Sequence, residues 1–311
     1  MFDIDKTISE FNVKHSIIRG NNMKKLYIIV LLLVFTGYSS AQIGDKLQLP
    51  QSEVEKYATP LATWSGTYFN SAGYYTASVS KIFGFKLSLV GMMIFIPEDQ
   101  RTFDVHPYDG YTGSEKSATF FGEKGAAILG AEEFIIYPPG VNMSSVPAGI
   151  PQVAFSFMGV EAMLRYFPKV NISDFEVNLL GWGLKYNFSQ LIPGLPLDIA
   201  AQILFNNFEA IHPDTEIKTS NTAFNVHASK SFGAFSIYGG LQYESTNMDY
   251  TYTFETLGIP ELDERIDISV AGENNMRLTF GAAVKVAVLV LNVDYNIGSQ
   301  NALVAGINFE F

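Results

Sequence analysis

Charged side chains at alternating positions of apolar segments are the first candidates for chemistry in this chain of 311 residues. Glu161 and Arg165 lie four residues apart in one such segment, so they share a strand face at a separation of roughly 13 Å. Because this distance is too long for an ion pair, we expect their partners on neighbouring strands. Other lumen-facing positions complete a polar cluster: Lys86, Glu161, Arg165, Asp198, Gln202, Arg277 and Asp294.

This cluster has two interpretations. It is either a polar constriction that filters solutes or an ion-pair network that fills a narrow lumen. We favour the network, because few strands leave little open space.

Catalytic and metal-binding patterns are weak. His227 shares a strand face with Asn225 and Ser229, but a Ser–His–acid triad requires a positioned third group, and none is evident. No two histidines stand at metal-ligand spacing, and the acidic residues at 261–264 read as a solvated run. The absence of cysteine excludes thiolate catalysis and cysteine zinc sites. We therefore expect no enzyme activity, no metal and no cofactor.

The composition narrows the class of protein. The chain is 48% hydrophobic and 14% aromatic, with only 16% charged residues, which excludes a disordered chain. Its 31 acidic residues outnumber 20 basic ones, so it lacks the positive field that binds nucleic acid.

The amino-terminal region carries an export pattern. Lys24 and Lys25 precede an apolar run at 26–35, about the length of the hydrophobic part of a signal peptide. The run is too short for a membrane-spanning helix, which needs roughly 20 residues. Small residues follow, so we expect cleavage between Ala41 and Gln42.

Met23 directly precedes the two lysines and can itself start a complete signal peptide. We therefore interpret residues 1–22 as a mis-called extension and residues 23–41 as the signal peptide. An acidic exported chain without cysteine suits a bacterial envelope.

From Phe85 onward the dominant period is two, as in strands. Phe85, Leu87 and Leu89 share one face, while Lys86 and Ser88 share the other. Ten such segments are predicted, at residues 85–96, 150–158, 159–168, 174–188, 196–208, 221–230, 234–256, 263–286, 287–297 and 301–311.

Segment length decides between a soluble β-sandwich and a membrane barrel. Soluble strands usually have about 5–6 residues, whereas these segments approach the 9–11 that cross a bilayer. Their apolar faces carry no charge. We predict a transmembrane antiparallel β-barrel of about 10 strands, within a range of about 10 to 14, in the outer membrane of a Gram-negative bacterium.

The carboxyl terminus supports this prediction. Gly306, Phe309 and the terminal Phe311 lie in an alternating segment that ends on an aromatic residue. This ending resembles the assembly signal of outer-membrane barrels, and the resemblance implies delivery by the barrel assembly machinery.

Residues 42–84 precede the predicted barrel at 85–311 and form a hatch or plug segment. Over Gln51 to Trp64, helical spacing places Val54, Tyr57, Leu61 and Trp64 on one face, and Ser52 with Glu55 matches a capping box. Pro60 weakens the helix. This helix either plugs the barrel mouth or lies against the periplasmic rim, and both alternatives stay open.

Two neighbouring stretches lack a clear strand pattern. Ala72 to Lys81 either adds a strand or crosses inside the barrel. Residues 97–151 have no sustained alternation and are expected to form the first extracellular loop, which can fold over the opening as a lid.

Three segments carry a family resemblance: Phe69–Ala77 (FNSAGYYTA), Phe83–Ser88 (FGFKLS) and Glu161–Pro168 (EAMLRYFP). They resemble a family of outer-membrane β-barrel proteins of unknown function, over nearly all of the expected mature chain. The plan of a hatch followed by a barrel is also similar to that of long-chain fatty-acid uptake barrels.

Three functions follow as hypotheses. The first is passive passage or binding of small hydrophobic or amphipathic molecules, suggested by the hatch and by the apolar lumen residues Val90, Met92, Ile94, Val288 and Val290. The second is a non-transporting anchor that presents its loops, 97–150 and 209–220, for interaction. The third is a narrow polar porin. Expected partners are outer-membrane lipid, lipopolysaccharide, the assembly machinery and a small hydrophobic ligand, but not nucleic acid.

Overall fold

The computed structural model describes residues 49–129, 134–172, 175–192, 194–213, 215–254 and 264–311. The expected extension at 1–22, the signal peptide at 23–41 and its cleavage site at Ala41 and Gln42 lie outside these residues. Within the described part, no helix is both long and apolar enough to span a membrane.

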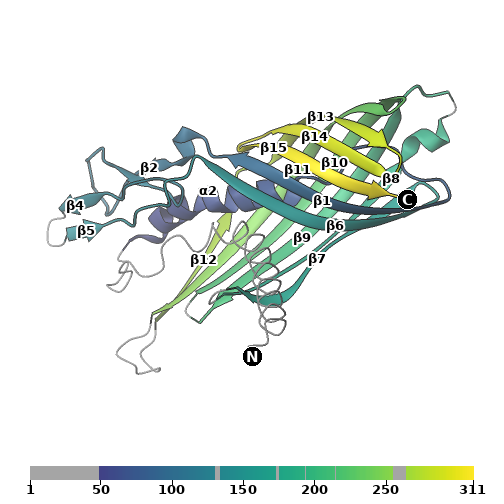
Figure 1. Cartoon of the computed structure of the whole chain (residues 1–311). Coiled ribbons are helices and arrows are strands. Elements are labelled where there is room, and N and C mark those ends of the chain that lie inside the picture. The colour runs from purple at the N-terminus through teal and green to yellow at the C-terminus, as the bar shows by residue number, and fades with distance from the viewer. Residues whose placement is uncertain (1–48, 130–133, 173–174, 193, 214, 255–263) are drawn as a thin grey trace, which may run out of the picture. The chain divides into compact units, whose positions relative to one another are not determined.

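The described chain forms a closed antiparallel barrel of ten strand positions around one long helix, α2 (Gln51–Asn70) (Figure 1). The predicted fold class and strand number are confirmed. The strands are β1 (Phe83–Phe95), β6 (Ser145–Phe157), β7 (Val160–Ile172), β8 (Phe175–Asn187), β9 (Asp198–His212), β10 (Thr215–Phe232), β11 (Phe235–Phe254), β12 (Glu264–Ala271), β13 (Met276–Val286), β14 (Leu289–Ile297) and β15 (Asn301–Glu310).

The barrel closes between its first and last strands. β1 pairs with β15 from Lys86 opposite Glu310 to Phe95 opposite Asn301. β12 and β13 both pair with β11 and together fill the tenth position. The single strand predicted at 263–286 is therefore interrupted at 272–275.

The two ends of the barrel differ. At one end, here named the turn end, β6–β7, β10–β11 and β13–β14 reverse within two residues, and Gly159 and Gly233 take the positive φ that such hairpin turns require. β8 and β9 are joined there by the short helix η2 (Phe188–Leu191). The opposite end, the loop end, carries the long connection between β1 and β6.

Of the three residues in the predicted carboxyl-terminal signal, Phe309 and Phe311 lie at the turn end, whereas Gly306 pairs with Val90 further along β1. Phe311 and Phe85 exchange two backbone hydrogen bonds of 2.9 and 3.0 Å, Phe309 faces outward, and Gly306 faces the lumen. Exposed aromatic rings gather at this end, as in the girdles of membrane barrels: Phe83, Phe157, Phe188, Phe232, Phe235 and Phe311.

The outer face of the barrel is an apolar belt. On β11 the outward row runs from Phe235 to Tyr243 with exposed, uncharged side chains. This span matches the roughly 9–11 residues of a tilted transmembrane strand. The same row continues as Ser245, Asn247 and Asp249, so β11 extends beyond the belt at the loop end. A soluble monomer rarely exposes so large an apolar surface.

Helix α2 and the chain after it lie inside the barrel, so the plug alternative holds and residues 72–81 cross the lumen rather than adding a strand. The helix includes Pro60 and continues six residues past Trp64, to Asn70. The predicted capping box is wrong, because Pro50 is the N-cap and Glu55 instead accepts a hydrogen bond from Gln51. The four residues expected on one helix face all lie in α2, with Leu61 and Trp64 buried and Val54 and Tyr57 partly buried. From Pro60 to Asn70 every residue is buried, so burial there is not limited to one face.

The long connection at the loop end, residues 96–144, is here named the cap. It contains η1 (Glu98–Gln100) and two small hairpins, β2 (Thr102–Asp104) with β3 (Lys116–Ala118) and β4 (Ala127–Leu129) with β5 (Phe134–Ile136). Strands this short show no sustained alternation, which explains why the sequence predicts only a loop. β6 begins at Ser145, five residues before its predicted start.

The belt generates a test of membrane insertion. Leu241→Arg places a charge on the outward row of β11 within the belt, and we expect it to cost about 2–4 kcal/mol of folding free energy in lipid. Asn247→Arg, on the same row above the belt, is the matched control and should leave stability unchanged. The folded fraction is measured by the heat-modifiable gel shift, and equal effects of both variants would contradict a lipid-facing belt.

Candidate functional site in the barrel lumen

The plug, residues 51–82, crosses the lumen once. Gln300 Nε2 donates to the Pro60 carbonyl (3.0 Å) at the loop end, and Arg165 Nη1 donates to Phe69 (2.6 Å) at mid-height. Gly159 N, in a turn, donates to Ser80 (3.1 Å). The plug therefore runs from the loop end to the turn end and continues into β1.

The second half of the plug, residues 71–82, is here named the strap. It is not helical, so its backbone cannot satisfy itself, and buried backbone groups need partners. Side chains of the barrel wall supply them over 2.6–3.5 Å. The donor and carbonyl pairs, counted from the end of α2, are Arg165 and Asn206 to Phe69, Gln242 to Asn70, Arg165 to Ser71, Gln152 to Ala72, Gln202 to Gly73, Lys185 to Thr76, Asn187 to Ala77 and Gln190 to Val79.

Arg165 is fully buried at the carboxyl end of α2. Besides Phe69 and Ser71 it contacts Gln152 Oε1 (3.0 Å) and Asn206 Oδ1 (3.4 Å), so all four acceptors are uncharged. The negative end of the helix dipole compensates part of its charge. The expectation that Arg165 finds its partners on neighbouring strands is therefore only half right, because two of them belong to the plug.

Arg277 forms a second group. Its Nη2 lies 2.8 Å from Glu244 Oε1, with both side chains buried, and its Nη1 donates to the Thr67 carbonyl (3.2 Å) and to the Ser71 hydroxyl. Asn274, in the break between β12 and β13, also donates to Glu244. This ion pair clamps the end of α2.

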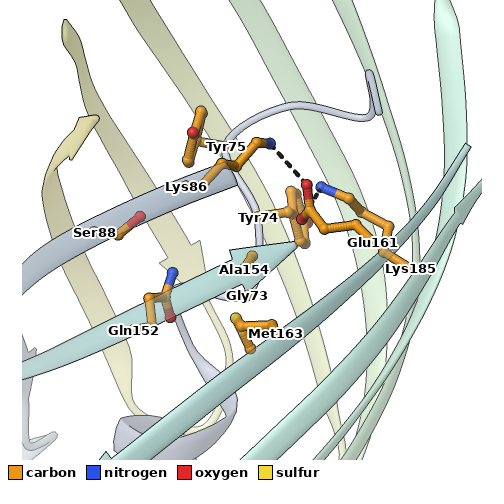
Figure 2. Close-up of a pocket in the computed structure, with 10 residues that line it drawn as sticks. All are labelled: Gly73, Tyr74, Tyr75, Lys86, Ser88, Gln152, Ala154, Glu161, Met163 and Lys185. Atoms are coloured by element: carbon orange, nitrogen blue, oxygen red, sulfur yellow. Dashed lines mark ion pairs between the residues drawn. The ribbon is translucent and has the colours of Figure 1, made fainter. Parts of the chain in front are cut away.

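Lys86, Glu161 and Lys185 form a third group near the turn end (Figure 2). Glu161 lies between two ammonium groups, with its Oε2 2.9 Å from Lys86 Nζ and its Oε1 2.7 Å from Lys185 Nζ. Lys86 also lies 3.5 Å from Glu310, which accepts a hydrogen bond from the strap hydroxyl of Tyr75 (2.6 Å).

A cavity of about 10 Å³ adjoins this group, room for about one water molecule. Its lining is mixed, with strap and wall residues: Gly73, Tyr74, Tyr75, Lys86, Ser88, Gln152, Ala154, Glu161, Met163 and Lys185. It offers no space for a hydrophobic ligand.

The remaining members of the predicted cluster lie apart. Asp198 accepts from Asn187 (3.0 Å), and Asp294 accepts from Tyr238 (2.8 Å) and Asn296 (2.6 Å). Gln202 binds the strap at Gly73. The structure thus divides the seven residues among several groups. Arg165, Gln202 and Arg277 bind the plug backbone directly. This geometry favours the space-filling interpretation over a solute filter.

Sequence reasoning missed several of the residues that hold the plug, above all Lys185 and Glu244. Lys185 lies in a predicted strand, but the lumen-facing row of β8 includes two glycines, Gly181 and Gly183, which hide the alternation. Glu176 lies on the other row of β8 and pairs with Lys169 at the loop end.

His227 takes part in packing. Its ring stacks on Tyr74 of the strap, with 3.8 Å between centroids, and its Nδ1 lies 2.7 Å from Asn225 Oδ1. Within the described residues, no group of three histidine or acidic side chains is arranged to hold a metal ion.

The cap docks on the start of α2. The carboxylate of Glu53 is fully buried and accepts hydrogen bonds from Lys56 Nζ (2.7 Å), His106 N (2.9 Å) and Tyr137 Oη (3.1 Å). Burial raises the pKa of Glu53, but these donors and the Lys56 charge outweigh it, so the pKa lies below its ordinary value of 4.5. An apolar cluster of Val105, Ile128 and Tyr137, with Leu49 packed against it, lies beside this carboxylate.

Comparison with protein families gives one match, over residues 23–311, to a family of unknown function, DUF6588. The chain belongs to this family. A search of curated proteins finds no match.

Three solved structures are similar at low identity. The translocator domain of the autotransporter NalP from Neisseria meningitidis is 8% identical, with 86% of this chain and 99% of that chain covered and a TM-score of 0.32. The attachment invasion locus protein Ail of Yersinia pestis is 8% identical, with 75% of this chain and 100% of that chain covered and a TM-score of 0.24. The toluene transporter TodX of P. putida is 9% identical, with 75% of this chain and 91% of that chain covered and a TM-score of 0.23. All three TM-scores lie well below 0.5, and the barrel of this chain follows from its own strand pairing.

The shared carboxylate of Glu161 predicts a strong coupling. Glu161→Gln leaves Lys185 buried without its anion and beside Lys86, which keeps only Glu310, and we expect a loss of about 3–5 kcal/mol in the free energy of unfolding. Lys185→Met in the same chain removes one of the two charges and should restore part of that loss. Urea unfolding in liposomes measures both variants, and additive effects would show that the two residues do not interact.

The depressed pKa of Glu53 predicts an acid-labile cap contact. The stabilisation that the Glu53 carboxylate gives to the folded state is fully present above its ordinary pKa of 4.5. It is lost as the pH falls through the lower pKa that Glu53 has in the folded protein. Hydrogen exchange of the first turn of α2, corrected for intrinsic rates, should therefore accelerate at pH values below that point. Glu53→Gln should show faster exchange at neutral pH and little further change on acidification; the same acid response in this variant would assign the effect to another group.

Proposed function

We propose that this protein is an outer-membrane β-barrel that its own amino-terminal plug keeps closed, and that it acts as an anchor presenting the cap at the cell surface. The observation that carries this proposal is the row of wall donors on the plug backbone from Phe69 to Val79.

Three features support the outer-membrane location. The belt has the height of a transmembrane barrel, the turn end carries an aromatic girdle, and Phe311, just after β15, exchanges backbone hydrogen bonds with Phe85 of β1 at this end. By the usual orientation of such barrels, the short turns face the periplasm and the cap lies outside. The belt then contacts lipid, the polar outer face of β11 above it lies at the level of lipopolysaccharide, and the assembly machinery inserts the chain.

The bonding of the plug favours a closed barrel over a gated one. A neutral hydrogen bond contributes about 0.5–1.5 kcal/mol net and one to a charged donor about 1.5–3 kcal/mol. Release of the plug would break bonds to wall residues on β6, β7, β8, β9 and β11 together. Spontaneous opening is therefore expected to be rare.

The cap supports the presenting role. It is folded, with two hairpins and a buried contact to α2, and it exposes Tyr108, Leu129 and Ile136. Exposed apolar groups in a folded surface element are typical of contact sites.

Passage of a small hydrophobic molecule is the second candidate. Buried apolar side chains of β1 and β6, among them Val90, Met92, Ile94 and Ile150, line the loop-end half of the lumen beside α2. Val290 is buried lower down, whereas Val288 lies exposed in the β13–β14 turn and does not face the lumen. Passage would require displacement of α2. A polar porin is third, because the lumen is occupied.

Bilayer and cell measurements separate these functions. The intact protein should show no steady conductance, and cells that produce it should take up a lipophilic dye no faster than cells without it. Deletion of residues 49–70 removes α2 and should create conductance. Deletion of residues 127–136, which shortens the cap but keeps the plug, is the control and should stay closed. Rapid dye uptake through the intact protein would instead support hydrophobic passage, and large stable conductance would support a porin.

A further inference from the structure

We propose that the barrel carries its own amino terminus to the outer side of the membrane, so that the chain ahead of Leu49 is displayed at the cell surface. This proposal rests on the membrane orientation in the proposed function and adds an activity to it: surface delivery of whatever sequence precedes the plug.

The start of the plug lies at the loop end. Leu49 packs against the cap cluster of Val105, Ile128 and Tyr137. Eight residues further on, Tyr57 Oη donates to the Pro139 carbonyl and the Tyr57 carbonyl accepts from Phe120 N, both at 3.0 Å. All these partners belong to the cap, so the chain enters the lumen from the cap side.

The plug then makes one complete crossing. α2 has 20 residues, so it is about 30 Å long, and it runs from the cap to mid-height, where Arg165 binds the Phe69 carbonyl; the strap covers the rest of the way. Ala77 N donates to Ser229 Oγ (2.9 Å), and the Ser80 carbonyl accepts from Gly159 N (3.1 Å), both close to the turn end. β1 starts there and leads back to the cap. Among the described residues, the plug is thus the first of eleven crossings, one in the lumen and ten in the wall.

A return of the preceding chain to the turn end has no route. Inside the barrel, the wall buries every residue from Pro60 to Asn70, and the cavity near the strap holds about one water molecule. Outside the barrel, an unpaired backbone would cross hydrocarbon, which costs several kcal/mol for each unsatisfied group. Leu49, the first described residue, therefore lies on the cap side, and the proposal extends this side to the chain that precedes it.

The chain contains no cysteine, so single-cysteine variants report the side of the membrane cleanly. Gly44→Cys and Ser52→Cys mark the chain ahead of the plug and the exposed start of α2. Asp109→Cys marks the cap, and Ala234→Cys marks the turn between β10 and β11. Intact cells are treated with a membrane-impermeant maleimide, and each variant is first shown to be folded by its heat-modifiable gel shift.

We expect Gly44→Cys and Ser52→Cys to be labelled on intact cells to the same extent as Asp109→Cys. Ala234→Cys should be labelled only after the outer membrane is permeabilised. If both amino-terminal positions are labelled only after permeabilisation, as Ala234→Cys is, the inference is overturned. Asp109→Cys and Ala234→Cys would then still support the orientation. If the markers themselves are exchanged, with Ala234→Cys labelled on intact cells, the orientation in the proposed function is wrong.

A short epitope inserted between Gln42 and Ile43 tests delivery directly. An antibody should bind it on intact cells, whereas the same epitope inserted between Gly233 and Ala234 should be reached only after permeabilisation. An epitope at position 42 that stays hidden on intact cells, in protein that is folded, would contradict surface delivery even if Ser52→Cys is labelled.

Discussion

The need to satisfy buried backbone groups determines most of what is found inside this barrel. The strap is an irregular segment enclosed by a wall, so its carbonyls cannot reach bulk water and cannot bond to one another. The wall therefore places amide, guanidinium and ammonium donors opposite them, from Phe69 to Val79. Arg165 shows how strong this requirement is, because the side chain stays charged and fully buried among uncharged acceptors, two of which are carbonyls at the end of α2.

The same constraint explains why the two halves of the lumen differ. A helix satisfies its own backbone, so the wall beside α2 can be apolar, and on β1 it consists of Val90, Met92 and Ile94. The strap begins where α2 ends, and from there the wall becomes polar, with Gln152 on β6 and Gln202 on β9. On β1, β6 and β9 the polarity of the lumen thus follows the secondary structure of the plug, whereas Glu244 on β11 and Arg277 on β13 form a buried ion pair beside the last turn of α2.

The sequence predicts the strands well because their outward rows alternate in apolar residues over the full height of the belt. It fails where that contrast disappears, as at Ser145 to Gly149 of β6 and at the loop-end extension of β10, whose outward side chains are polar. The helix is predicted only to Trp64 because Ser65 to Asn70 contains poor helix formers. Enclosure by the wall overrides that local preference.

The candidate site is only partly predictable for a different reason. Alternation identifies which side chains enter the lumen, so Glu161, Arg165 and Arg277 are found. Their partners are set by the height at which the plug sits, which joins residues about one hundred to two hundred positions apart in the chain. No periodic pattern contains that information, and so the expected strand-to-strand contacts of Arg165 are in large part contacts to the plug.

The closing seam of the barrel joins all of these contacts. Glu310, on the last strand, faces Lys86 of the first strand across the seam. Its carboxylate is within ion-pair distance of Lys86 and Lys285 and accepts the hydroxyl of Tyr75 from the strap. Because one residue of β15 binds the first strand, β13 and the plug, the final strand can complete its bonding only when the strap is already in place. The contacts that close the barrel and those that hold the plug thus share one carboxylate, which couples closure of the seam to fixation of the strap.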